Sequence, residues 1–180
     1  MLTQTDTLTL RRLAKQDIDA FLAYRCDPDV AKFQGWEHMD RNGALGFLEH
    51  MAQVPLLQLG QWTQLALAGR SDDVLLGDFG VHLSGDGREI ELGITLAADA
   101  QGRNIGFEAV EMITAWLFAR TQIDRIVAIT HADNKRALSL LSRTPFKHTH
   151  DTHDVIDGVA TPERWFELRR DWFQARRVSV

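Results

Sequence analysis

The sequence predicts an α/β fold, a mixed central sheet of about six to seven strands flanked by about four helices. Two observations indicate it. Strand-like segments follow one another in the middle of the chain with only short polar turns between them, which is typical of an antiparallel meander. A long apolar helix and a buried strand come next, and such a strand–helix–strand unit is normally parallel and right-handed.

The N-terminal third of the chain is predicted to supply one strand and two helices. Alternation of leucine and threonine indicates a short strand at residues 8–10. Apolar residues at helical spacing predict a helix over residues 14–25, which ends at the Asp27-Pro28 step because a residue before proline disfavours the helical conformation. A second helix is expected over residues 40–54, where the next residue is proline.

The remaining elements follow from the same periodicities. Alternating or continuous apolar segments predict strands, helical spacing predicts helices, and segments rich in Gly and Asp mark turns. In order, we expect strands at residues 62–68, 74–83 and 88–96, a helix at 105–120, a strand at 125–130, a helix at 134–142, and closing strands around 146–150 and 164–169. No linker or low-complexity segment divides them, so a single domain is expected over residues 1–180.

Composition argues against several function classes. The formal net charge of −5 and the pI near 5.8 disfavour a dedicated nucleic-acid binder, because phosphate binding needs clustered surplus Lys and Arg. Cys26 is the single cysteine, which excludes an internal disulfide and suits a reducing compartment. The sequence contains no apolar segment with the length of a signal peptide core or a membrane span. We therefore expect a cytoplasmic protein that binds neither nucleic acid nor membrane.

Residues 101–106, Gln-Gly-Arg-Asn-Ile-Gly, join a strand to the start of the long helix. A helix N-terminus carries unpaired backbone N–H groups and the positive end of the helix dipole, so a loop of small residues before it can wrap a pyrophosphate. Gly102 and Gly106 allow the backbone to approach closely. Asn104 tolerates positive φ, and Arg103 adds charge. A plain turn followed by a helix cap would give the same pattern.

Four segments in order and spacing carry a family resemblance: TDTLTLRRLAKQDIDAFLAYRCDPDVAKFQGW, IELGITLAADAQGRNIGFEAVEMITAWLFA, RIVAITHADNKRALSLLSRTPF and DGVATPERWFELRRDWF. They resemble the GNAT acetyltransferase superfamily, most closely its RimJ/RimL-type branch, which acetylates N-terminal amines of ribosomal and other proteins and has small-amine relatives. The resemblance runs from Leu8 to about Trp172. It implies the GNAT acyl-CoA N-acyltransferase fold and acetyl transfer to a primary amine.

Acetyl-CoA is the acyl donor that the resemblance implies. The pantetheine arm would lie in a gap between the strands at residues 88–96 and 125–130, bonded to backbone groups. The implied binding residues are Ile94, Thr95, Leu96, Gln101, Gly102, Arg103, Asn104, Ile105, Gly106, Phe107 and Asn134. Asn134 is also suited to an ordinary N-cap, and both roles can hold together.

Two positions depart from the family pattern. The family loop usually has glycine where this chain has Asn104, so a side chain must fit beneath the pyrophosphate. The family often has tyrosine, the commonest proton donor to the departing thiolate, where this chain has Leu141. Ser139 or Ser142 is a candidate substitute, and both are equally compatible with ordinary helix-surface serines.

Acetyl transfer to an amine needs a base, because an amine is mostly protonated at neutral pH. Glu89 and Glu91 share one strand face by the period-two rule, and Glu91 matches a position at which several family members carry a base. The alternative is a strand carboxylate paired with Arg88 or another surface base. His131 is the second candidate, because imidazole titrates near neutral pH; a turn residue is its alternative. The predicted catalytic residues are Glu91, His131 and Ser142.

Residues 148–154 concentrate imidazole and carboxylate side chains. Strand alternation would place His148 and His150 on one face, which is compatible with a metal site and with a solvated hairpin. We interpret the segment as a hairpin and expect no metal. Trp36 either lines an acceptor pocket or packs in the core.

Other function classes remain as hypotheses beside the enzyme. One is a non-catalytic sensor that binds CoA or acyl-CoA, favoured by Asn104 and Leu141, and another is an interaction module on the same fold. For the enzyme, the expected partners are acetyl-CoA and an amine acceptor, either a peptide N-terminus or a small molecule. Pairing into a homodimer is common among relatives. The segments that would shape the acceptor pocket carry no motif that names a substrate.

Overall fold

The computed structural model of the chain describes residues 1–34, 36, 39–156 and 159–178. Its centre is an eight-stranded sheet with strand order β1-β2-β3-β4-β5-β6-β8-β7. The strands are β1 (Thr3–Gln4), β2 (Leu8–Arg12), β3 (Trp62–Gly69), β4 (Leu75–Leu83), β5 (Glu89–Leu96), β6 (Arg125–His131), β7 (Lys147–Ile156) and β8 (Val159–Arg169). The sheet exceeds the expected six to seven strands because the two-residue strand β1 pairs with β2.

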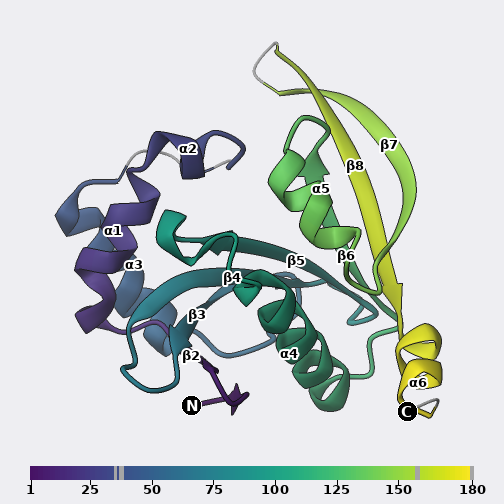
Figure 1. Ribbon diagram of the computed structural model, residues 1–180, viewed down its shortest axis with the longest axis horizontal. Helices are drawn as coiled ribbons and strands as arrows, with labels where there is room; N and C mark the ends of the chain where they lie inside the picture. Colours follow the sequence, from purple (N-terminus) through teal and green to yellow (C-terminus); the bar gives the residue numbers. More distant parts are fainter. Residues whose placement is uncertain (35, 37–38, 157–158, 179–180) are drawn as a thin grey trace.

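The sheet is antiparallel throughout except at one junction. β5 and β6 pair in parallel, as the strand–helix–strand pattern predicts. Their pairing covers only Glu89 with Arg125, Ile90 with Ile126, and Glu91 with Val127. Beyond Glu91 the two strands diverge, which opens the sheet between its two halves (Figure 1).

The helices lie on both faces of the sheet. They are α1 (Ile18–Arg25), α2 (Pro28–Ala31), α3 (Arg41–Gln53), α4 (Ile105–Arg120), α5 (Lys135–Leu141) and α6 (Arg170–Val178). Leu65 and Leu67 of β3 belong to the core that contains α4, whereas Ala66 belongs to the core that contains α1 and α3. Since successive strand residues point to opposite faces, α4 covers one face and α1 and α3 cover the other. No helix in the described ranges is long and apolar enough to span a bilayer.

The Asp27-Pro28 step has a second effect that the sequence prediction omits. It follows the end of α1 as expected, but Asp27 also caps the short helix α2, accepting a hydrogen bond from the backbone N–H of Asp29 at 2.9 Å. Proline suits the first helical position because its missing N–H would have no partner there. The chain therefore turns immediately into a second helix, which brings the next residues toward the opening of the sheet (Figure 1).

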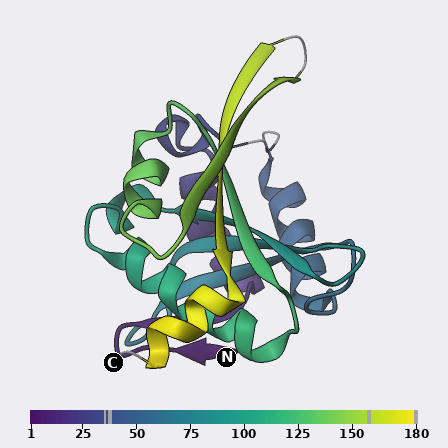
Figure 2. The same cartoon turned by 90° about the vertical axis from the view of Figure 1, so that its right-hand side faces the viewer.

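The C-terminal elements extend further than predicted. β7 and β8 form a long hairpin that projects beyond the body of the molecule (Figure 2), and α6 follows β8 directly. Arg170 of α6 donates hydrogen bonds to the carbonyl oxygens of Phe118, Thr121 and Ile123, at 3.0, 2.8 and 2.7 Å. Because the last carbonyls of a helix lack partners within it, this arginine fixes α6 against the end of α4.

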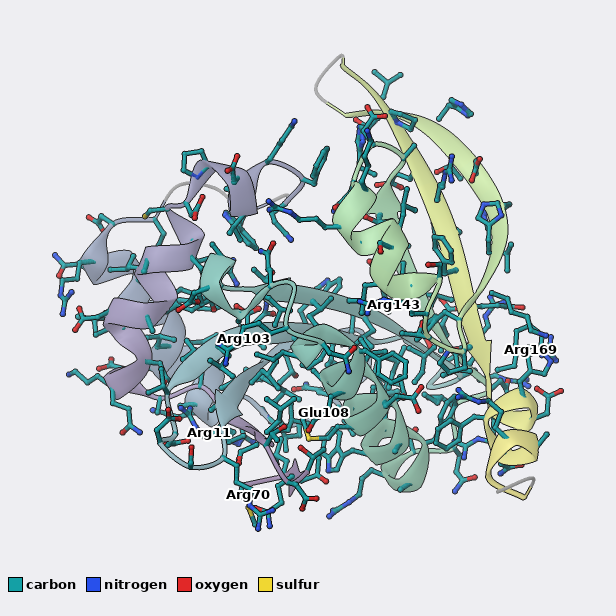
Figure 3. The ribbon with its side chains drawn as sticks, in the orientation of Figure 1. Arg11, Arg70, Arg103, Glu108, Arg143 and Arg169 are labelled. Carbon is teal, nitrogen blue, oxygen red and sulfur yellow. The ribbon has the colours of Figure 1, made fainter. Side chains whose placement is uncertain are left out.

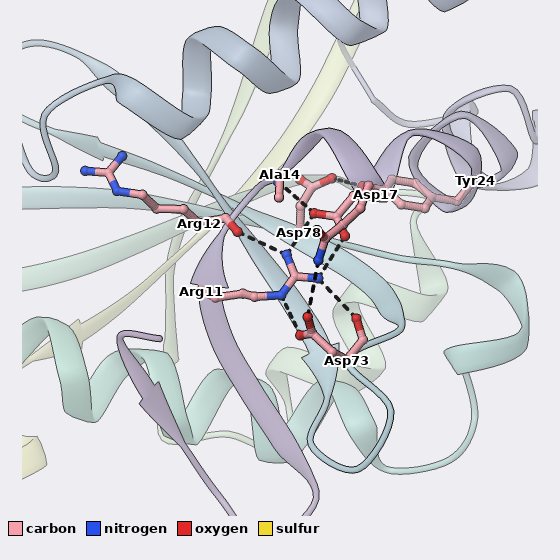
Figure 4. A network of polar contacts seen from close by, with 8 residues as sticks. Arg11, Arg12, Ala14, Asp17, Tyr24, Asp73 and Asp78 are labelled. Atoms are coloured by element: carbon pink, nitrogen blue, oxygen red, sulfur yellow. Dashed lines mark hydrogen bonds and ion pairs between the residues drawn. The ribbon is translucent and has the colours of Figure 1, made fainter.

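Ion pairs join the N-terminal elements to the sheet (Figure 4). Arg11 of β2 bonds to Asp17 at 2.8 Å and to Asp73, in the turn before β4, at 2.7 Å. Deeper in the same face, the fully buried Asp78 accepts hydrogen bonds from Tyr24 and Gln64 and pairs with Arg25 at 3.3 Å. Buried charges are stable only when paired and hydrogen-bonded, so these contacts fix how α1 sits on β4.

Candidate active site

A cavity of about 500 Å³ occupies the opening between β5 and β6. Its walls come from elements far apart in the sequence: the segment after α2, both diverging strands, α4, α5 and β8. The lining residues are Lys32, Phe33, Gln34, Leu92, Gly93, Ile94, Val110, Ala128, Ile129, Thr130, His131, Asn134, Ala137, Leu140, Leu141, Phe146, Thr161 and Glu163. The cavity is where the resemblance implies the pantetheine arm.

The β5 edge that faces the cavity has backbone groups without a strand partner. On its other edge β5 is fully paired with β4, from Leu83–Ile90 to Gly77–Leu96. The pairing with β6 ends at Glu91, so the β6-facing edge of residues 92–96 is open. At the end of this edge the Gln101 side chain donates to the carbonyl oxygen of Leu96 at 3.0 Å. An extended ligand with amide groups could bond to this edge as a strand does.

The loop before α4 has the backbone shape of an anion-binding turn. Gly102 has φ of +72° and Asn104 has φ of +62°. Asn104 is the N-cap of α4, yet its side chain makes no capping hydrogen bond. Within the described residues, no protein partner is found for the backbone N–H groups of residues 102–107. A set of converging, unpaired N–H groups at the positive end of a 16-residue helix is suited to phosphate.

Two arginines accompany this loop, and both are labelled in Figure 3. Arg103 lies in the loop itself and is exposed. Arg143, just after α5, approaches the side-chain oxygen of Asn104 at 3.4 Å. Arg143 was not predicted from the sequence, because only the fold brings the end of α5 to the loop before α4.

Gly106 and Asn134 have structural roles as well. A Cβ added at Gly106 would lie 3.3 Å from side-chain carbons of Leu96 and Leu140, so glycine lets α4 pack closely on β5 and α5. Asn134 caps α5, accepting from the backbone N–H of Ala137 at 3.2 Å, and also lines the cavity. The N-cap prediction for Asn134 is confirmed.

Glu91 and Glu89 share a strand face as predicted, but their surroundings differ. Glu89 is paired with Arg125 at 2.5 Å. For the half-buried Glu91 side chain, no ion pair or hydrogen bond is found within the described part of the chain. Burial raises the pKa of Glu91, the charges of Glu163 and Glu89 raise it further, and His82 opposes them. The surface-pair alternative thus describes Glu89 rather than Glu91.

His131 is the last residue of β6 and lines the cavity. Its ring stacks on Phe33, with centroids 5.2 Å apart. Nδ1 accepts a hydrogen bond from the backbone N–H of Asp133 at 3.0 Å, which leaves Nε2 as the ring nitrogen without a described protein partner. The stack joins the segment after α2 to β6 across the opening of the sheet.

The structure does not bring Ser142 to the cavity. It is the exposed C-cap of α5, and its hydroxyl donates to the carbonyl oxygen of Ser139 at 3.0 Å. Leu141 lines the cavity and is almost fully buried, so an apolar wall occupies the position where relatives often have tyrosine.

Two other interpretations are corrected or decided by the structure. A bulge in β7 pairs His148 with Phe166 and His150 with Trp165, which are consecutive residues of β8, so the two histidines point to opposite faces and not to one.

Trp36 packs against the core beneath α1 and α3, with the guanidinium of Arg25 3.8 Å from its ring centroid. Trp36 is not among the residues that line the cavity.

The diverging parallel strands and the loop before α4 together define the GNAT fold. Residues 7–147 match the family described as Acetyltransferase (GNAT) domain. The chain therefore belongs to this family, as the sequence resemblance predicts.

Individual relatives agree with this assignment. The chain is 25% identical over 146 residues to the uncharacterized N-acetyltransferase YoaA of Bacillus subtilis, covering 80% of this chain and 81% of that protein. A GNAT-family acetyltransferase from Bacillus anthracis has a similar structure, with a TM-score of 0.83 at 14% identity over 93% of this chain and 98% of that one. Spermidine N-acetyltransferase of Vibrio cholerae, solved with CoA and spermine, has a TM-score of 0.78 at 14% identity, covering 94% of this chain and 99% of that one. At such identities the structural likeness shows the fold.

Proposed function

We propose that the chain transfers an acetyl group from acetyl-CoA to a primary amine, by direct attack while both substrates are bound. The observation that carries the proposal is the cavity together with three features of the elements around it, of which the open edge of β5 lines the cavity itself. These are the open edge of β5, the unpaired N–H groups before α4, and the half-buried, unpaired carboxylate of Glu91. A cosubstrate with an amide-containing arm and a phosphate end matches the open edge of β5 and the N–H groups before α4. An amine substrate matches the carboxylate of Glu91.

The residues present fit acetyl-CoA. The backbone of residues 102–107 would hold the pyrophosphate, with Arg103 and Arg143 adding positive charge. The open edge at Ile94–Leu96 would bond the pantetheine amides, and Asn134 faces the same cavity. When bound, the cosubstrate supplies an activated acetyl group as a thioester.

Glu91 is proposed as the base. Of the two protons that an ammonium substrate loses on becoming an amide, one leaves through Glu91 to solvent and the other ends on the departing thiol. A carboxylate whose pKa is raised by burial is a stronger base than an exposed one. Because Ser142 lies outside the cavity, we propose solvent as the proton donor to the thiolate. His131 remains the second candidate base.

Finer features of the proposal rest on the sequence resemblance. The cavity is compatible with two kinds of acceptor. One is a peptide N-terminus, as in the RimJ/RimL-type branch, and the other is a small amine, such as the one named for the Vibrio cholerae relative. The proposal includes a single catalytic domain and a cytoplasmic location, where the free thiol of Cys26 would stay reduced.

A non-catalytic acyl-CoA sensor is the second candidate function. Leu141 favours it, because the cavity has an apolar wall where relatives often place the proton donor. The sensor would bind acetyl-CoA without turnover.

Calorimetric titration of the purified chain with acetyl-CoA, followed by thiol release against amines and N-terminal peptides, distinguishes these functions. The enzyme is expected to bind and turn over. Binding without turnover on any acceptor would favour the sensor, and no binding would contradict both.

A further inference from the structure

A carboxylate faces the cavity from the side of the opening opposite to β5. Glu163 of β8 lines the cavity and stands directly across from His131 in the β6–β8 register. Its side chain is half-buried, and no ion pair or hydrogen bond to it is found in the described ranges. Its neighbour on the same strand face, Glu167, is paired with Arg125 at 3.3 Å. On this face of the sheet Glu89 and Glu167 are paired with Arg125, whereas for Glu163 and Glu91 no counter-ion is found among the described residues.

Glu163 and Glu91 interact electrostatically, although only Glu163 is among the residues that line the cavity. They lie close enough for the charge of Glu163 to contribute to the raised pKa of Glu91. The cation of the cavity lining, within the described residues, is Lys32. Lys32 is exposed, its ammonium lies 5.2 Å from the ring centroid of Phe33, and no ion pair joins it to a described carboxylate. Solvent screens an exposed charge strongly, so Lys32 does not neutralise the half-buried carboxylates.

The surface of β5 next to Glu91 is not covered by a side chain at Gly93. Gly93, two residues further along β5 on the same face, is exposed and lines the cavity. No atom lies within 4 Å of the position that a Cβ would take there. Its cross-strand partner Gly80 is also without a side chain and lies beneath the ring of Trp62. An acceptor can thus lie over Gly93 with its amine beside Glu91.

We propose that Glu163 is an acceptor-binding residue that pairs with a second positive charge on the substrate. The substrate class is then a primary amine that carries a further ammonium group, such as an α,ω-diamine. This inference rests on the proposed function, because it assigns separate tasks to the two carboxylates. Glu91 receives the proton of the reacting amine, while Glu163, which has no counter-ion among the described residues, pairs with a cation of the ligand.

The test compares three acceptors of equal chain length with the full chain and saturating acetyl-CoA: 1,4-diaminobutane, 1-aminobutane and 4-aminobutanoate. We expect kcat/KM for the diamine to exceed that for the monoamine by about tenfold or more, since pairing a partly desolvated charge is worth at least that factor. In Glu163→Gln this ratio should fall to about one to two, and Glu163→Asp should keep a preference for the diamine. The matched control Glu167→Gln removes a paired carboxylate of the same strand face and should leave the ratio unchanged.

Equal kcat/KM for diamine and monoamine in the wild type, a ratio insensitive to Glu163→Gln, or a preference for 4-aminobutanoate would each overturn the inference. If no amine is turned over, calorimetry of 1,4-diaminobutane with the protein–CoA complex separates the two proposals. Binding that is lost in Glu163→Gln would support the charge site while the catalytic proposal fails. Absence of diamine binding to the wild-type complex would overturn the charge site.

Discussion

The raised pKa of the Glu91 carboxylate carries a cost in stability and is the basis of the chemical role proposed for it. Burial raises its pKa, so the folded protein disfavours the ionised form that an exposed glutamate adopts at neutral pH. The same change makes the ionised form a better proton acceptor. A side chain kept on a strand face without a counter-ion, beside a cavity, is expected at a catalytic position more often than at a structural one.

Glu91→Gln tests the proposed base. Activity needs the ionised carboxylate, so kcat/KM of the wild type should fall as pH is lowered through a pKa that lies above the ordinary glutamate value of about 4.3. The variant should lose about 10²- to 10⁴-fold in kcat/KM at neutral pH. The measurement is the pH profile of thiol release. An unchanged acid limb in the variant would transfer the role to His131 or to water.

Glu91→Gln is expected to raise the free energy of unfolding at neutral pH, although it lowers activity. The folded-state pKa of Glu91 is higher than the unfolded one, so the folded protein binds the proton more tightly. Wild-type stability should therefore decrease as pH rises from the unfolded pKa through the folded pKa. Urea denaturation should show Glu91→Gln to be more stable than wild type at neutral pH, with the difference vanishing below about pH 4. A variant less stable than wild type at neutral pH would show that the Glu91 carboxylate has a stabilising partner.

Asn104 supports the left-handed turn before α4 without being the best residue for it. Its φ of +62° costs an L-residue about 1–2 kcal/mol, and asparagine less than most. Asn104→Gly should bind acetyl-CoA at least as tightly as wild type, because glycine relaxes the turn and removes a side chain near the proposed phosphate site. Asn104→Ala should lower the free energy of unfolding by about 1 kcal/mol. Weaker binding by the glycine variant in calorimetry would show that the amide itself contacts the ligand.

At the scale of elements, local chemistry predicts well where an element needs only its own residues. The apolar spacing of α4 and the residue types of the loop before it gave the bounds Ile105–Arg120 directly. The bulge between His148 and His150 could not be predicted, since a bulge is fixed by pairing with β8 and reverses the face of every later side chain. Helix α2 was missed because its four residues carry too little periodicity.

The junction of β5, α4 and α5 provides the element-scale prediction. Even a Cβ at Gly106 would lie 3.3 Å from side-chain carbons of Leu96 and Leu140, so a large side chain must displace α4 from β5 and α5 and distort the loop before α4. Gly106→Trp should abolish detectable acetyl-CoA binding in calorimetry. Gly85→Trp is the matched control, because Gly85 lies in the turn before β5 with no atom within 4 Å of its Cβ position. Undiminished binding by Gly106→Trp would place the phosphate site elsewhere.

At the scale of the whole molecule, the site depends on contacts that no local pattern contains. The resemblance pointed to the proposed cosubstrate loop and to Glu91 as the proposed base, because both lie within continuous segments of the chain. Arg143 and Glu163 were missed because α5 and β8 reach the site only through the sheet order. Phe33 reaches it through α2 and its stack on His131, which again requires the folded chain.

Acetyl-CoA is proposed to lie in the opening between β5 and β6 with its phosphates before α4. Hydrogen–deuterium exchange with and without acetyl-CoA tests it most directly, because the amides of residues 102–107 have no protein partner in the described structure. Exchange is expected to slow on binding at residues 102–107 and along the β6-facing edge of residues 92–96. Protection confined to other segments, or binding that leaves both of these unchanged, would contradict it.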